Sequence, residues 1–88
     1  MYTVEYLPEA IEDIQKIKKI GKNSIKRKLE KLQEELKEHP KTGTGKPEYL
    51  KYKKCWSRRI DEEHRLCYEI HDDVVIVLVL SAFGHYEE

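Results

Sequence analysis

The chain has 88 residues with 17 basic and 17 acidic side chains, so its formal net charge is zero. A chain of this length forms one domain with a modest core, which we expect to span residues 1–88. No stretch is long and apolar enough to span a bilayer, and the N-terminus lacks the basic-then-apolar order of a signal peptide, so we expect a soluble, cytoplasmic protein.

The first predicted elements are a strand and a helix. Residues 2–7 alternate between apolar and polar side chains, as the residues of an amphipathic strand do. Pro8 suits the first turn of a helix, and acidic side chains follow it at the positive end of the helix dipole. An apolar stripe of helical period then continues until Gly21, which we expect to end the helix.

A second amphipathic helix is predicted to begin near Asn23 or Ser24 and to stop near His39. Pro40 disfavours helical backbone in the residue before it. The helix has one apolar face, with steps of four, three and four residues, made by Ile25, Leu29, Leu32 and Leu36. Because the connection between the helices is short, we expect them to form an antiparallel pair.

The next segment is basic and begins with a loop. Residues 39–60 carry seven basic side chains and one acidic, which predicts a positive patch on a neutral protein. The loop residues Gly43–Lys46 resemble the end of a phosphate-binding P-loop. The match fails, because Pro40 stands where that motif has glycine and Pro47 stands where it has serine or threonine.

The C-terminal half has the period-two pattern of strands. A turn is predicted at residues 72–73, and the expected strands cover residues 49–52, 56–60, 65–71 and 74–81. The element order β-α-α-β-β-β(-β) predicts an α+β fold in which both N-terminal helices pack on one face of an antiparallel sheet. The side chains expected to meet the helices are those of Val4, Tyr6, Leu66, Tyr68 and Ile70.

The other face of this sheet is predicted to be open and basic. Arginines are unusual on buried strand faces, so their presence on strands indicates a surface that meets an anion. A two-residue turn at Glu62–Glu63 places Arg58 on the same side as Arg65, whereas a bulge exchanges Arg58 for Arg59. The sequence leaves this choice open.

The candidate catalytic groups suit acid–base chemistry on a phosphodiester. The serines lie in no nucleophile motif, and the four histidines share no metal-ligand spacing, so no metal or cofactor is expected. RNA carries its own nucleophile in the 2′-hydroxyl, so cleavage needs a base, an acid and fixed positive charge. Glu48, His85 and Arg65 have these chemistries.

At these residues the sequence resembles the YoeB/Txe branch of the RelE toxin superfamily. The resemblance is carried by Gly45–Glu48, by the motif Trp56–Ile60, by Glu62–Leu66 and by His85–Tyr86. It implies the compact RelE-like α+β fold. It also implies an endoribonuclease toxin of a type II toxin–antitoxin system, which cleaves mRNA in the ribosomal A site without a metal ion.

The resemblance further implies a role for each matching residue. Glu48 is the general base, His85 is the general acid and Arg65 binds the phosphate and the transition state. Tyr86 stacks on or orients the substrate near the acid. The residues implied to hold the RNA backbone or ribosomal RNA electrostatically are Lys51, Arg58 and Arg59.

The partners implied by the resemblance are a second copy of the toxin and a cognate antitoxin of the YefM/Axe type. The C-terminal segment of the antitoxin wraps the toxin, and the complex of the two, not the toxin alone, binds operator DNA and represses its own operon. An alternative function is a non-catalytic module of the same fold that acts only as antitoxin partner and co-repressor. The neutral net charge and the acidic residues Glu87–Glu88 favour that alternative.

Overall fold

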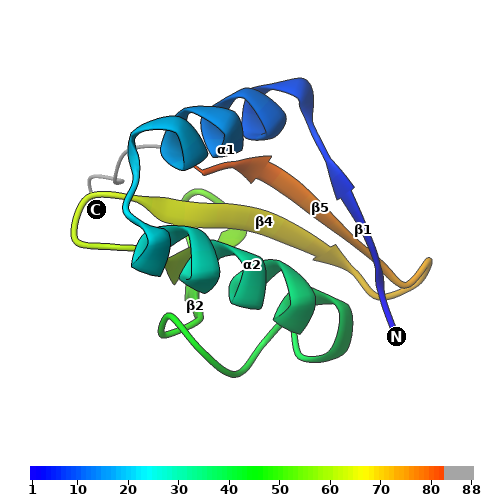
Figure 1. Cartoon of the computed structure of the whole chain (residues 1–88). Coiled ribbons are helices and arrows are strands. Elements are labelled where there is room, and N and C mark those ends of the chain that lie inside the picture. Colours follow the sequence, from blue (N-terminus) through cyan, green and yellow to red (C-terminus); the bar gives the residue numbers. More distant parts are fainter. Residues whose placement is uncertain (83–88) are drawn as a thin grey trace.

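The computed structural model describes residues 1–82, which form two helices over one face of a five-stranded sheet (Figure 1). The sheet order is β1-β5-β4-β3-β2. This arrangement confirms the predicted α+β class. The elements are β1 Thr3–Tyr6, α1 Pro8–Ile20, α2 Asn23–Glu38, β2 Glu48–Leu50, β3 Cys55–Arg59, β4 Arg65–His71 and β5 Ile76–Ser81.

The sheet is mixed, and this corrects the expectation of a wholly antiparallel one. The pairs β2–β3, β3–β4 and β4–β5 are antiparallel, but β1 lies parallel to β5, with Val4 opposite Val77. A parallel pair needs a long connection between its strands. The helices and the remaining strands supply that connection here, while the period-two pattern of a strand is the same for both directions.

The two helices begin and end where the sequence predicts. Pro8 is the first residue of α1, and the backbone N–H of Gly21 donates to the Ile17 carbonyl at 2.7 Å to close its last turn. The chain then reverses into α2, which runs back over the sheet (Figure 1). Neither helix in the described residues is both long and apolar enough to cross a membrane.

The main core lies between the helices and the sheet. The helices contribute Ala10, Ile14, Ile17, Leu29, Leu32 and Leu36, all buried. The sheet contributes Leu66, Tyr68, Val77 and Val79, with Val4, Tyr6 and Ile70 packed against them. Every side chain predicted to meet the helices therefore does so. Burying such residues supplies most of the stability, because each large apolar side chain contributes about 1.5–3 kcal/mol.

Arg58 points from β3 into this core, and its side chain is 0% exposed. Its Nη1 forms an ion pair with the Glu35 carboxylate of α2 at 2.7 Å, and its Nε donates to the Tyr68 hydroxyl of β4 at 3.1 Å. A buried guanidinium must have such partners, since an unpaired buried charge is very costly. The expectation that Arg58 binds RNA is therefore wrong: the residue is a core ion pair on the helix side of the sheet.

The same guanidinium holds the loop that joins α2 to β2. Its Nη2 donates to the backbone carbonyls of Thr42, at 2.7 Å, and of His39, while Nη1 reaches the Thr44 carbonyl at 3.3 Å. Glu35 binds the loop from the other end of the ion pair, accepting hydrogen bonds from the Thr44 amide and hydroxyl at 2.8 and 2.7 Å. The loop is thus ordered by one ion pair.

We predict that Arg58→Met lowers the free energy of unfolding by about 3 kcal/mol, because it keeps the aliphatic stem but removes the cation from Glu35 and the donor from several loop carbonyls. The neighbouring Arg59→Met is the matched control. Arg59 is exposed, so the same substitution there should change stability by less than about 0.5 kcal/mol. Urea unfolding of both variants measures the difference, and equal losses would contradict the assignment.

The Glu35 carboxyl also predicts how stability depends on pH. Burial by itself raises its pKa, but the hydrogen bonds from Thr44 and Arg58 outweigh burial, so the pKa lies below its ordinary value. A group with a depressed folded pKa stabilises the protein above its unfolded pKa and loses that contribution as the pH falls. Stability should therefore decline below about pH 4.5.

Glu35→Gln should weaken this acid dependence. Urea unfolding between pH 7 and pH 3 measures the slope for the variant and for Glu34→Gln, whose carboxylate lies on the exposed side of α2. Glu34→Gln should keep the wild-type slope. If Glu35→Gln kept the full acid dependence of stability, other carboxyl groups would be responsible for that dependence.

Candidate active site

The second face of the sheet carries a small basic hollow. Because side chains alternate along a strand, the inward position of Arg58 turns Ser57 and Arg59 to this face. The register then sets Arg59 beside Arg65 of β4 and Ser57 beside Glu48 of β2. The open choice between the two arginines is settled by this pairing: Arg59 shares a face with Arg65.

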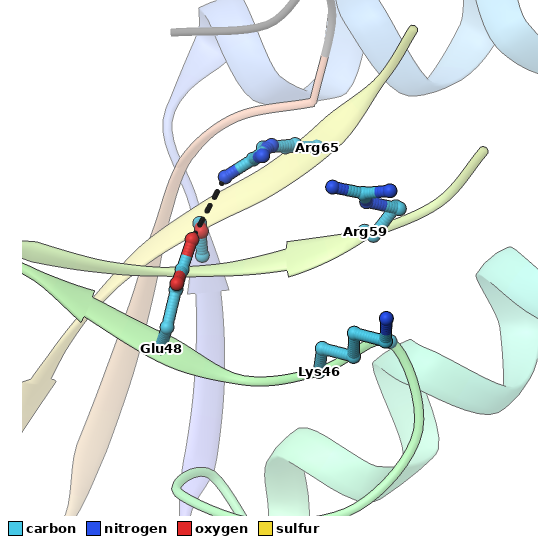
Figure 2. Close-up of a pocket in the computed structure, with 6 residues that line it drawn as sticks. Lys46, Glu48, Arg59 and Arg65 are labelled. Atoms are coloured by element: carbon cyan, nitrogen blue, oxygen red, sulfur yellow. Dashed lines mark hydrogen bonds and ion pairs between the residues drawn. The ribbon is translucent and has the colours of Figure 1, made fainter. Parts of the chain in front are cut away.

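Figure 2 shows four charged side chains that approach one another at this hollow: Lys46, Glu48, Arg59 and Arg65. The lining is completed by Gly45 and Ser57, and the enclosed volume is ≈ 70 Å³. Pockets that enclose a whole small molecule measure about 300–1,000 Å³. The hollow is therefore sized for one group of a larger ligand, such as one phosphate of a nucleic acid.

Glu48 and Arg65, both predicted as site residues, are in direct contact. Arg65 Nη1 donates to Glu48 Oε1 at 3.0 Å, across the width of β3 (Figure 2). The Arg65 side chain is 18% exposed and that of Glu48 is 52% exposed. Ion pairs with one partner this exposed contribute about 0–1 kcal/mol, so a competing anion can separate them.

The hollow has an excess of positive charge. Among the described residues that line it, Glu48 is the one carboxylate, against the cationic groups of Lys46, Arg59 and Arg65. Within residues 1–82, neither Lys46 nor Arg59 forms an ion pair. Cations without counter-charges attract anions, and the planar fork of arginine matches the geometry of a phosphate.

The remaining predicted residues have different positions. Lys51 is exposed in the turn of residues 51–54 beyond β2 and does not line the hollow. His85 and Tyr86 lie outside the described residues. The chain leaves β5 at Ala82, whose backbone N–H donates to the buried Asp13 of α1 at 3.1 Å.

Lys46 is the functional candidate that sequence reasoning missed. The sequence places it in the failed P-loop match and in the family motif Gly45–Glu48, but neither pattern assigns it a role. In the structure it follows Gly45, which accepts a hydrogen bond from the Arg59 amide at 2.7 Å. Gly45 has a φ of +84°, and a Cβ there would lie 2.7 Å from the Arg59 carbonyl oxygen. This close approach brings Lys46 to the hollow.

The backbone of Lys46 is strained. Its φ is 52°, in the left-handed region that residues with side chains rarely adopt. Such a conformation costs about 1 kcal/mol or more and is often found at functional sites. A glycine here would avoid that cost, so the presence of a lysine indicates that its side chain has a role.

No grouping of three or more histidine, cysteine, aspartate or glutamate side chains suited to a metal ion is found in residues 1–82. The two cysteines are buried and unbridged. The chemistry available in the described hollow is that of one carboxylate and three cationic groups.

Comparison with known proteins identifies the family. Residues 6–86 match the family described as the YoeB-like toxin of bacterial type II toxin-antitoxin systems. The chain belongs to this YoeB-like toxin family. It is 39% identical to Toxin YoeB of Mycobacterium bovis over 88 residues, an alignment covering 98% of this chain and 100% of the relative. The resemblance read from the motifs is thus confirmed, and the chain is a toxin of a toxin–antitoxin system.

Solved YoeB structures share the fold. A YoeB/ParE toxin from Agrobacterium tumefaciens superposes with a TM-score of 0.84 at 28% identity, covering 96% of this chain and 99% of that one. A YoeB dimer from Staphylococcus aureus gives 0.79 at 30% identity, covering 97% and 98%. A YoeB–YefM complex from the same species gives 0.76 at 29% identity, covering 98% and 99%.

We predict that Gly45→Ala destabilises the YoeB-like fold by about 1–2 kcal/mol, because it adds strain at positive φ and presses a methyl group on β3. It should also shift the amide resonance of Arg59, whose hydrogen bond to Gly45 it stretches. Thermal unfolding and NMR measure the two effects. Thr42→Ala, an exposed change in the same loop, is the control, and a Gly45 variant as stable as this control would contradict the prediction.

Proposed function

We propose that the chain is an endoribonuclease toxin that cleaves mRNA in the ribosomal A site by metal-independent acid–base chemistry. The observation that carries the proposal is the contact of Glu48 with Arg65 inside a hollow of net positive charge. A carboxylate held beside cations can accept a proton while the cations bind a phosphate. Membership of a toxin family supports the direction of the proposal.

In the proposed reaction the Glu48 carboxylate takes the proton of a ribose 2′-hydroxyl. The 2′-oxygen attacks the adjacent phosphorus, and the bond from phosphorus to the 5′-oxygen breaks. His85 gives a proton to that leaving oxygen, so the products are a 2′,3′-cyclic phosphate and a free 5′-hydroxyl. The nucleophile belongs to the RNA, so the step requires no metal-bound water.

Arg65 has two successive partners in this proposal. In the free protein its guanidinium binds Glu48 at 3.0 Å. When RNA arrives, its phosphate takes the place of Glu48 at the guanidinium, because the half-exposed ion pair is weak. As the 2′-oxygen attacks, the doubly charged phosphorane that forms binds the guanidinium more strongly. Glu48 is thereby released towards the 2′-hydroxyl, and Arg65 neutralises charge where it develops.

The other RNA contacts proposed are those of Arg59, Lys51 and Tyr86. Arg59 faces the same hollow as Arg65, and Lys51 is exposed at the end of β2 beside it. Tyr86 is proposed to stack on a base next to His85. Arg58 has no part in RNA binding, because it is buried on the helix side of the sheet.

The proposal extends to the partners and the place of action. The YoeB–YefM complex and the YoeB dimer of Staphylococcus aureus support a YefM-like antitoxin and a homodimer for this chain. We propose that operator DNA is bound only by the toxin–antitoxin complex. A toxin that acts on ribosomes works in the cytoplasm, and we propose that residues 1–88 form a single toxin domain.

Glu48→Gln, Arg65→Lys and His85→Ala should each lower the rate of mRNA cleavage on programmed ribosomes at least about a hundredfold. Arg65→Lys keeps the charge but loses the planar fork that binds phosphate. Glu62→Gln, an exposed change in the β3–β4 turn, is the matched control for Glu48→Gln and should cleave like the wild type. Thermal unfolding confirms that each variant is folded.

Two further readouts test the proposed mechanism. The product should carry a 2′,3′-cyclic phosphate, and a 2′-deoxy substitution at the cleaved nucleotide should block the reaction. Full activity in all three site variants would refute the assigned roles. A wild-type protein that binds an antitoxin and operator DNA but neither cleaves RNA nor arrests growth would instead be the non-catalytic co-repressor.

A further inference from the structure

The loop before β2 is attached to β3 by two consecutive residues of that strand. On the helix side of the sheet, the Arg58 side chain donates to the carbonyls of Thr42 and Thr44. In the plane of the sheet, the next residue, Arg59, donates its backbone amide to the Gly45 carbonyl at 2.7 Å. Two consecutive residues of one strand therefore hold the loop, and they determine where Lys46 emerges from it.

The conformation at Lys46 is one that glycine adopts more easily. The loop already uses glycine at positive φ twice, at Gly43 and Gly45, yet the third residue with positive φ in the loop is a lysine. Pro47 follows it and restricts its backbone further. A side chain kept where it adds strain is better explained by what the side chain does than by the stability of the loop.

The charges of the hollow indicate what Lys46 does. Glu48 is already paired with Arg65, so Lys46 and Arg59 are the cations left without a counter-charge in the described part of the chain. Lys46 lies on the loop side of the hollow and Arg59 on the strand side (Figure 2). An ammonium and a guanidinium that face one small open space form a binding site for an anionic group.

We infer that Lys46 is a further RNA ligand of this site, which binds the phosphodiester backbone together with Arg59 while Arg65 and Glu48 act on the reacting nucleotide. The inference rests on the proposed function for the identity of the anion, an RNA phosphate. Lys46 is a binding residue in this scheme. Its ammonium contributes one positive charge to substrate binding and takes no part in proton transfer.

Lys54 provides an unusually close control. It is also an exposed lysine, and its φ of 54° nearly equals the 52° of Lys46. It lies in the turn of residues 51–54 and does not line the hollow. Substitution of either lysine therefore removes one exposed positive charge at positive φ, and only the position relative to the hollow differs.

The experiment compares Lys46→Ala, Lys46→Gly, Lys54→Ala and Lys54→Gly. The probe is a three-nucleotide RNA with 2′-O-methyl groups, which cannot be cleaved because its nucleophile is blocked. Calorimetric titration at several salt concentrations gives the affinity and its salt dependence. Thermal unfolding of the same samples gives the stability.

Both Lys46 variants should bind the probe about tenfold more weakly, and the slope of log K against log salt should fall by about 0.7, as expected for one lost phosphate contact on a single strand. The Lys54 variants should stay within about twofold of the wild type. Both glycine variants should unfold at the same temperature as the wild type or higher, because glycine relieves the strain. Weaker binding by a more stable protein separates a role in binding from a role in folding.

The inference is overturned if the wild type does not bind the probe, if the Lys46 variants keep wild-type affinity and salt slope, or if the Lys54 variants lose affinity equally. These outcomes are independent of the proposed reaction. Binding that depends on Lys46 in a protein that cleaves no mRNA would refute the ribonuclease and retain the ligand. Cleavage that depends on Glu48, together with probe binding that does not depend on Lys46, would retain the ribonuclease and refute Lys46 as a ligand.

Discussion

The buried guanidinium of Arg58 is the constraint on which the rest of this structure depends. A cation that is permanently charged and removed from water must be surrounded by acceptors, because desolvation without compensation costs many kcal/mol. Here the acceptors come from α2, from β4 and from the loop that joins α2 to β2. One side chain therefore connects the helix layer, the sheet and the irregular segment between them.

The site on the opposite face follows from the same constraint. Alternation along β3 turns Arg59 outward once Arg58 is buried, and the pairing of β3 with β4 sets Arg65 beside it. The loop that Arg58 holds carries Gly45 and Lys46 to the edge of the hollow. The strand that forms the floor of the basic hollow thus carries a core ion pair on its opposite face.

Much of the fold is predictable because its patterns are local. Pro8, Gly21 and Pro40 punctuate the helices, and the apolar stripe of α2 identifies its buried face. The direction of β1 in the sheet could not be predicted in this way, since a strand shows the same alternation of side chains beside a parallel or an antiparallel partner. Only the complete sheet decides it, and the pairing that does so joins residues more than seventy positions apart.

The site is predictable in part for related reasons. Glu48 and Arg65 could be named from their chemistry and motif, and they meet across β3 in the folded chain. Arg58 was misjudged because arginine is seldom fully buried, and adjacent arginines differ only by the register of the strand. Lys46 was given no role because its position depends on backbone angles and on a hydrogen bond to β3, neither of which a residue pattern records.

The pairing of β1 with β5 has a consequence for how the toxin is made. β1 is an edge strand whose partner in the sheet is β5, so the first strand to leave the ribosome has no sheet partner until the last strand emerges. A nascent chain is synthesised from its N-terminus and can close such a contact only near the end of translation. Fragments that end before β5 therefore lack a complete sheet, so early termination of synthesis releases no folded toxin.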